Sequence, residues 1–273
     1  MSLLGLLLLC YAFYRNCVQR SRMREERVFF DSPNGEKLAG ILHHPKSENA
    51  RGAVLLCHGM ESNKESDKLM FLSRALAQRD LLTLRFDFAG VGESTGSFAN
   101  ITYSAEVEDL QAAFSFMRAR HAGKIGILGS SMGGTVALLF AARNPDVAAL
   151  VTLAAPLHPE RFLSRLSTPE ELQQWRERGF IFYHGQRINV SLLNDLEKMN
   201  VVHALRKINC PVLILHGDRD DVVPVEEAHE LHHHLPGMSK LSILAGADHR
   251  ISDPSLMKRT LSEAIDWFCE HAP

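Results

Sequence analysis

The chain has 273 residues, of which 45% are hydrophobic and 23% are charged, and its formal net charge is −2. This balance is typical of a soluble globular protein with one sizeable core, and without a basic excess nucleic-acid binding gains no support. The five cysteines are odd in number and scattered, so they predict no disulfide framework and favour a reducing, cytoplasmic compartment.

The N-terminal segment Leu3–Tyr14 is almost wholly apolar, but its roughly twelve residues fall short of the ~20 that a spanning helix needs. No basic residue precedes it and no small-residue cleavage site follows, so a secretory signal fits poorly. The arginines between Arg15 and Arg24 would keep the following domain cytoplasmic if the segment inserted. Residues 1–22 are therefore a weak membrane tether or an extra helix, or else translation begins at Met23 and these residues are not part of the protein.

Residues 23–273 read as one domain in which strands alternate with helices. The predicted strands are Arg27–Phe30, Lys37–Leu42, Ala53–Cys57, Leu81–Phe86, the apolar segment from Lys124 to Leu128, Ala149–Leu153, Val212–Leu215 and Lys240–Leu244. The predicted helices are Leu69–Gln78, Thr102–Arg118, a helix containing Val136–Ala142, Val225–Leu235 and Ser255–Glu270. The first two strands form a hairpin, and the later alternation predicts a mostly parallel twisted sheet with helices on both faces.

The strand Ala53–Cys57 leads into His58, Gly59 and Met60. Open α/β sheets keep their ligands at the carboxyl ends of the strands, so this loop is expected to border the site. Gly59 lets the backbone come close to the site, and His58 is expected to hydrogen-bond within the loop.

The strand that begins at Lys124 leads into Gly129-Ser-Ser-Met-Gly133, and a helical segment follows at once. This is the G-x-S-x-G pattern in a strand–turn–helix context, which predicts a nucleophile at Ser131 on a sharp, strained turn. Bulky side chains two residues before and after the serine would clash, which explains the two glycines, and Gly134 allows close packing of the helix. Ser130 is off the centre of the pattern and is assigned a structural role.

The alternation of strands and helices breaks between the sixth and seventh predicted strands, over residues 157–208. A long insertion above the strand ends is the usual place for a cap over a site. Its aromatic residues either line a substrate pocket or attach the cap to the core. They are Trp175, Phe180, Phe182 and Tyr183.

A serine hydroxyl needs a base to accept its proton, and the base needs an orienting carboxylate. On this architecture the order along the chain is Ser, then Asp or Glu, then His. Asp220, after the strand Val212–Leu215, is the favoured acid, with Asp221 as the alternative and Asp218 assigned to the turn. His249 follows the last strand and is the predicted base. The backbone N–H groups of Met132 and Met60 would form the oxyanion hole.

Several other patterns are better explained without chemistry. The histidines 229 and 232–234 lie on a polar helix with no carboxylate or cysteine partner at ligand spacing, so no metal is expected. Gly90 and Gly92 form only part of a dinucleotide fingerprint, and no cofactor is expected. Arg85 and Asp87 are expected to brace the loop after their strand rather than to bind substrate.

With Ser131, Asp220 and His249 placed, the chain from about residue 25 to 271 resembles enzymes of the α/β-hydrolase fold. The stretch Arg85-Phe-Asp-Phe-Ala-Gly-Val-Gly-Glu-Ser94, followed by Gly96-Ser-Phe-Ala-Asn100, is similar to bacterial cinnamoyl and feruloyl esterases. It also resembles the serine aminopeptidase-like hydrolase domain, which includes monoacylglycerol lipase relatives. The resemblance to the first group implies a hydroxycinnamoyl substrate under a short cap, although residues 157–208 do not match that cap.

The expected function is hydrolysis of a small-molecule carboxylic ester through an acyl-serine intermediate, without metal or cofactor. Two alternatives remain open at the level of sequence. The same residues could cleave peptides or amides, which mainly demand better protonation of the leaving group. The fold could also serve as a non-catalytic binding module.

Overall fold

The computed structural model describes residues 24–47, 49–166 and 168–272. The segment Leu3–Tyr14 and the alternative start at Met23 lie outside these residues. Within the described ranges, none of the helices combines the length and the apolar character needed to cross a bilayer.

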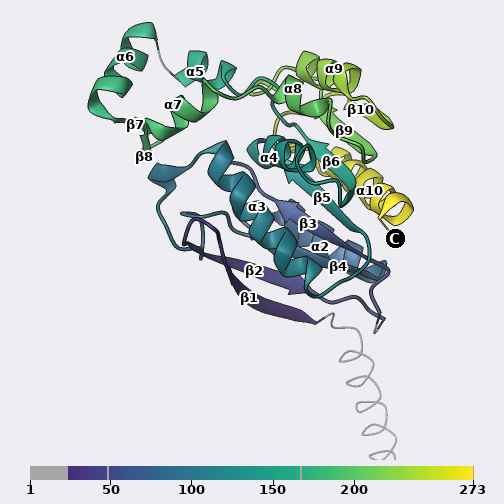
Figure 1. Cartoon of the computed structure of the whole chain (residues 1–273). Helices are drawn as coiled ribbons and strands as arrows, with labels where there is room; N and C mark the ends of the chain where they lie inside the picture. The colour runs from purple at the N-terminus through teal and green to yellow at the C-terminus, as the bar shows by residue number, and fades with distance from the viewer. Residues whose placement is uncertain (1–23, 48, 167, 273) are drawn as a thin grey trace, which may run out of the picture.

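An eight-stranded sheet in the order β1-β2-β4-β3-β5-β6-β9-β10 forms the centre of the molecule (Figure 1). Its strands are β1 (Glu25–Asp31), β2 (Lys37–His43), β3 (Gly52–Cys57), β4 (Leu81–Phe86), β5 (Ile125–Ser130), β6 (Val147–Leu153), β9 (Val212–Gly217) and β10 (Ser239–Leu244). The hairpin β1–β2 is antiparallel and joins β4 in antiparallel register, and all other pairs are parallel. The predicted hairpin and the mostly parallel sheet are both confirmed.

The burial of the strands explains why these segments pair as they do. Every residue of β3, β4, β5 and β9 is buried, as expected for parallel strands covered on both faces. The edge strand β1 is partly exposed along its length. Its charged residues reduce the hazard that an open edge presents.

Helices cover the two faces of the sheet and enclose two separate hydrophobic clusters. Leucines of α2 (Asp67–Gln78) and apolar residues of α10 (Pro254–His271) fill one face. The other face is covered by α3 (Tyr103–Arg118), α4 (Met132–Ala141) and α9 (Val225–His234). This layering leaves the carboxyl ends of the parallel strands uncovered by these helices, and the loops of the site lie there.

The chain between β6 and β9, residues 154–211, is called the insertion below. It contains α5 (Arg161–Leu166), α6 (Pro169–Arg178), the antiparallel hairpin β7 (Phe180–Tyr183) and β8 (Gln186–Asn189), α7 (Ser191–Leu196) and α8 (Val201–Leu205). Figure 1 shows α5, α6, the hairpin and α7 gathered at one end of the molecule, above α3. Local signals set the ends of α6, because Thr168 and Glu171 form a capping box and Gly179 adopts a left-handed conformation.

The aromatic residues of the insertion divide between the two roles that the sequence left open. Trp175 is wholly buried, in a hydrophobic cluster that includes other residues of the insertion, so it takes a packing role. Tyr183 lines a large cavity, together with Phe162. Phe182 takes neither role, because 69% of its surface is exposed.

Candidate active site

The serine of the G-x-S-x-G pattern sits on a strained turn between β5 and α4. Ser131 has φ of 52° and ψ of −124°, a conformation that a non-glycine residue rarely adopts. A Cβ added to Gly129 would lie 2.1 Å from the carbonyl oxygen of Gly133, and one added to Gly133 would lie 2.3 Å from that of His58. The predicted steric reason for both glycines is therefore confirmed.

A chain of hydrogen bonds joins the serine to the histidine and the aspartate that the sequence singled out. The distance from Nε2 of His249 to Oγ of Ser131 is 3.1 Å. The distance from Nδ1 of His249 to Oδ2 of Asp220 is 2.8 Å. The three residues follow β5, β10 and β9, so the carboxyl edge of the sheet brings them together from distant parts of the chain.

The Asp220 side chain is completely buried and surrounded by donors. Its Oδ1 accepts the N–H groups of Val222 and Val223, and its Oδ2 also lies 3.2 Å from Nε2 of His216. Burial alone would raise the pKa of Asp220, but the hydrogen bonds from His216, His249 and Val223 hold the pKa well below its usual range. The carboxylate therefore stays ionised beside the imidazole.

The sequence analysis did not assign a role to His216, although a histidine within an apolar strand is a recognisable signal. It is the one histidine within the otherwise apolar β9 segment Val212-Leu-Ile-Leu-His216. Its Nε2 also lies 2.9 Å from the carbonyl oxygen of Val223, so it ties the loop that carries Asp220 back to the strand. A polar residue inside a buried strand, four positions before the predicted acid, could have revealed this contact.

The two neighbouring aspartates lie in different surroundings. Oδ1 of Asp218 accepts the N–H of Gly246 at 2.6 Å, so this side chain links its loop to the turn after β10. Asp221 lines the cavity, whereas the His249 imidazole contacts Asp220.

The loop after β3 brings its backbone against the nucleophile. A Cβ on Gly59 would lie 3.1 Å from Cβ of Ser131, so the close approach expected here is present. His58 donates from Nδ1 to the carbonyl oxygen of Gly59 and accepts the N–H of Phe88 at Nε2. Burial lowers the pKa of His58, which suits the neutral form that these two bonds require.

The N–H groups predicted for the oxyanion hole remain available. Within the described residues, no hydrogen bond joins the backbone N–H of Met60 or Met132 to another protein group. Both residues line the cavity beside Ser131. Met132 is also the first residue of α4, where the helix dipole favours negative charge.

Asp87 braces the loop after β4, as expected, whereas Arg85 contacts the loop after β3. Asp87 accepts the N–H and the ammonium of Lys64 and the N–H of Glu93, while the Arg85 guanidinium donates to the carbonyl oxygen of Lys64. Neither residue is among those that line the cavity.

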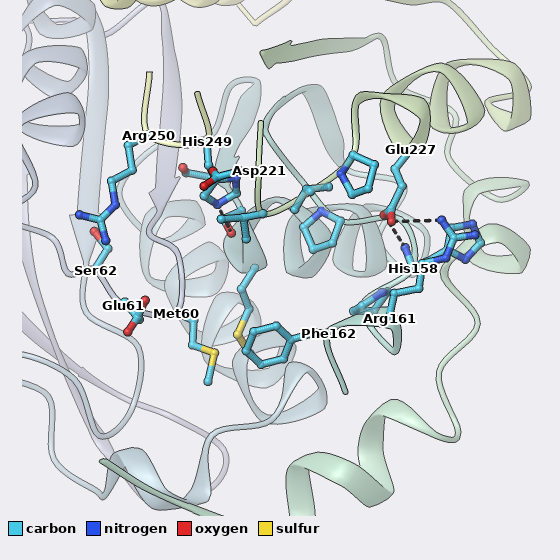
Figure 2. A pocket seen from close by; sticks show the side chains of 18 of the residues that line it. Met60, Glu61, Ser62, His158, Arg161, Phe162, Asp221, Glu227, His249 and Arg250 are labelled. Carbon is cyan, nitrogen blue, oxygen red and sulfur yellow. Dashed lines mark hydrogen bonds and ion pairs between the residues drawn. The ribbon is translucent and has the colours of Figure 1, made fainter. Parts of the chain in front are cut away.

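The predicted site residues meet in a cavity of about 800 Å³ (Figure 2). One wall comes from loops that follow strands of the sheet, and the other comes from the insertion. Its lining combines apolar residues with charged ones at both ends. The apolar lining residues are Met60, Tyr103, Met132, Pro156, Pro159, Phe162, Tyr183, Val222, Val223 and Pro224.

The histidines of α9 take part in surface contacts. Nδ1 of His232 lies 2.9 Å from Oγ of Ser239, and His234 lies 3.7 Å from a carboxylate oxygen of Glu230. Over the described ranges, no group of three or more His, Cys, Asp or Glu side chains is arranged to hold a metal ion.

The sheet order, the helical layers and the turn at Ser131 are those of the α/β-hydrolase fold. A family described as serine aminopeptidase, S33, matches residues 48–178.

Known proteins support this assignment. The serine hydrolase BPHL of Homo sapiens is 26% identical over 229 residues, which span 77% of each chain. The mitochondrial palmitoyl-protein thioesterase ABHD10 of Bos taurus is 24% identical over 230 residues, covering 78% of this chain and 72% of the relative. The ferulic-acid-bound Est1E of Butyrivibrio proteoclasticus superposes with a TM-score of 0.77 at 23% identity, over 89% of this chain and 100% of Est1E. These relatives place the chain among the hydrolases.

Proposed function

We propose that this protein hydrolyses carboxylic esters through an acyl-enzyme formed on Ser131. The observation that carries the proposal is the chain of hydrogen bonds from Ser131 through His249 to Asp220. It supplies a nucleophile, a base and an orienting carboxylate in the order that nucleophilic catalysis requires.

In the first half of the reaction, His249 Nε2 accepts the proton of Ser131 as Oγ attacks the ester carbonyl carbon. The negative oxygen of the tetrahedral intermediate accepts hydrogen bonds from the N–H groups of Met60 and Met132. The intermediate then collapses, the bond to the alcohol oxygen breaks, and His249 gives its proton to that oxygen. Asp220 stabilises the imidazolium and holds the imidazole in the tautomer that carries a proton on Nδ1.

In the second half, water attacks the acyl-serine. His249 accepts a proton from the water, and the same two N–H groups bind the second oxyanion. Collapse breaks the bond to Ser131 Oγ, the imidazolium returns its proton to the serine, and the acid leaves. The cycle consumes one water and needs no redox change, so it balances with the groups that the site contains.

The cavity and the relatives favour an ester substrate. Apolar side chains such as Phe162, Tyr183 and Val223 line much of the wall beside Ser131, and such a wall suits an acyl or aryl group. BPHL is described as a serine hydrolase and ABHD10 as a palmitoyl-protein thioesterase. Est1E has bound ferulic acid. The proposed acyl transfer to Ser131 agrees with these descriptions.

The decisive experiment is hydrolysis of p-nitrophenyl acetate and butyrate by the full chain and by Ser131→Ala. We expect turnover by the parent and its loss, by about 10⁴-fold or more, in the mutant. Ser115→Ala, an exposed serine on α3, is the matched control and should behave as the parent.

Labelling by a fluorophosphonate separates the alternatives. Covalent labelling of the parent but not of Ser131→Ala, with amides rather than esters turned over, would identify an amidase or peptidase with the same nucleophile. A folded parent that neither turns over esters nor accepts the label would point instead to a binding module.

A further inference from the structure

A lysine lies beside the proposed nucleophile with no acidic partner. Lys68, in the first turn of α2, lines the cavity, and its ammonium donates to Oγ of Ser130 at 3.3 Å. Among the described residues, no carboxylate forms an ion pair with it. A hydroxyl oxygen is therefore the one hydrogen-bond acceptor that the described part of the chain offers this ammonium.

Lys68 is half-buried, and it differs from the two fully buried cations, Lys64 and Arg85. The Lys64 ammonium lies 2.6 Å from a carboxylate oxygen of Asp87 and 2.8 Å from one of Glu93. The Arg85 guanidinium lies 2.8 Å from a carboxylate oxygen of Glu65. Withdrawing a cation from water without an anion is costly. The half-buried Lys68 ammonium, which lines the cavity without such a partner among the described residues, is therefore free to pair with an anion on a ligand.

A second cation lies nearby. Arg250 directly follows His249 and lines the same cavity, and no ion pair joins it to a described carboxylate. Burial lowers the pKa of Lys68, and the positive charge of Arg250 lowers it further. Asp248 opposes this effect, but its Oδ1 already accepts the N–H of Ser252. Figure 2 shows Arg250 and Ser62 at the His249 end of the cavity.

At the opposite end of the cavity, the positive charge of Arg161 is paired with a carboxylate. The Arg161 guanidinium donates to Oε1 of Glu227, whose Oε2 accepts the N–H groups of Leu157 and His158. Figure 2 shows this group well away from Arg250. Carboxylates also line the end beside His249, but Glu61 pairs with His184 and Asp248 accepts the N–H of Ser252. Among the described residues, Lys68 and Arg250 are thus left there without an ion pair.

The position beside His249 identifies which half of the substrate would meet these cations. His249 returns its proton to the departing alcohol oxygen, so groups that flank it face the alcohol rather than the acyl chain. We infer that Lys68 and Arg250, with the Ser62 hydroxyl, form a subsite for a carboxylate or phosphate group on the alcohol. The preferred substrates are esters whose alcohol is an anion. This inference rests on the proposed ester hydrolysis.

The test compares esters whose alcohols carry an anionic or a neutral group at the same position. The full chain is given 4-(carboxymethyl)phenyl butanoate, 4-(phosphonomethyl)phenyl butanoate and the neutral 4-(carbamoylmethyl)phenyl butanoate, in which a methylene insulates the phenol from the varied group. The readout is the ratio of kcat/KM for each anionic ester to that for the neutral one. We expect a ratio of about ten or more in the parent, larger for the anion that the subsite prefers.

Variants of Lys68 and Arg250 show which residue produces the preference for the anionic ester. Lys68→Met should bring the ratio to near one, Arg250→Gln should lower it in part, and Lys68→Arg should retain most of it. Lys258→Met removes an exposed lysine of α10 and should keep the parent ratio. Each variant is first checked by thermal unfolding, and Lys68→Gln replaces Lys68→Met if the latter does not fold.

The outcomes separate this inference from the proposed function. Hydrolysis of all three esters by the parent with ratios near one would overturn the subsite and leave ester hydrolysis intact. If no ester is hydrolysed, the proposed function fails, and calorimetric titration of 4-hydroxyphenylacetate decides the subsite. Binding to the parent that weakens about tenfold in Lys68→Met supports it, and absent or equal binding overturns it.

Discussion

The two walls of the cavity are held in different ways. On the sheet wall, Asp220 and His249 are fixed by several hydrogen bonds in loops that directly follow strands. On the insertion wall, Phe162 and Tyr183 contact each other edge to face, with ring centroids 5.5 Å apart. The first wall has a geometry fixed by the sheet, and the second depends largely on packing.

A contact between the insertion and the rest of the domain is likewise weaker than the hydrogen bonds that hold the sheet wall. His184 and Glu61, at the cavity mouth, form an exposed ion pair of 2.6 Å, a type of contact that contributes little to stability. The residues proposed for the reaction thus lie where the strands end, whereas the insertion contributes to the shape of the pocket. Mutations on the two walls should therefore separate turnover from substrate preference.

The largest effect is expected from His249→Ala on the sheet wall. Without the imidazole, Ser131 has no group to accept its proton, so kcat for p-nitrophenyl butyrate should fall by about 10⁴-fold or more. KM should change little, since the imidazole contributes mainly to the transition state. A loss of less than about tenfold would contradict the assignment of the base.

The next largest effect is expected from Asp220→Asn. The amide cannot stabilise the imidazolium and can donate to Nδ1, which favours the wrong tautomer, so kcat should fall by about 10³- to 10⁴-fold. Asp221→Asn is the matched variant and should lose less than about tenfold. The reverse pattern, with near-normal turnover in Asp220→Asn, would assign the acid to Asp221.

A smaller effect of another kind is expected from Phe162→Ala on the insertion wall. Removing the ring takes apolar area from the pocket, so KM for p-nitrophenyl butyrate should rise about three- to tenfold with little change in kcat. The control is Phe71→Ala, which removes an exposed ring of α2. A fall in kcat comparable to that of Asp220→Asn would mean that the insertion also positions the reacting groups.

The smallest effect concerns stability on the sheet side. Glu106 of α3 is buried, its Oε2 has no hydrogen-bond partner, and burial together with the charge of Asp109 raises its pKa well above 4.5. The folded state thus binds this proton more tightly than the unfolded state, so stability falls as pH rises above about 4.5. Glu106→Gln should remove this loss and raise the unfolding temperature at pH 7 and 8 more than at pH 5.

The control for this prediction is Glu108→Gln, two residues along the same helix and more exposed. It should shift the unfolding temperature by a similar small amount at every pH. A gain in Glu106→Gln that did not grow with pH would show that the buried carboxyl does not carry the linkage.

The sequence predicted the residues whose place depends on strand ends. Ser131, Asp220 and His249 each follow a strand, and the carboxyl edge of a parallel sheet brings such residues together regardless of their separation along the chain. The inner strands β3, β4, β5 and β9 were predictable for a related reason, because their buried apolar runs are short and bounded by turns.

The residues that the sequence did not reveal depend on packing between distant elements. Lys68 reads as an ordinary exposed residue of an amphipathic helix, and only the seating of α2 beside the turn of Ser131 brings it to Ser130. The hairpin β7–β8 escaped prediction because its strands have four residues each and only one buried residue between them, so they lack the pattern of burial that marks a strand of the sheet.

The chain directly after β6 contacts the turn of Ser131, and these contacts set the limits within which the insertion could be exchanged in a chimera. Ala155 packs closely against Gly134, because a Cβ added to Gly134 would lie 2.6 Å from the Cβ of Ala155. Oγ1 of Thr135 donates to the carbonyl oxygen of Pro156. Ala155 and Pro156 thus pack against the turn of Ser131, and Glu227 accepts the N–H groups of Leu157 and His158. A graft from a relative that starts after His158 and ends before β9 would exchange the pocket while leaving the machinery of Ser131 in place.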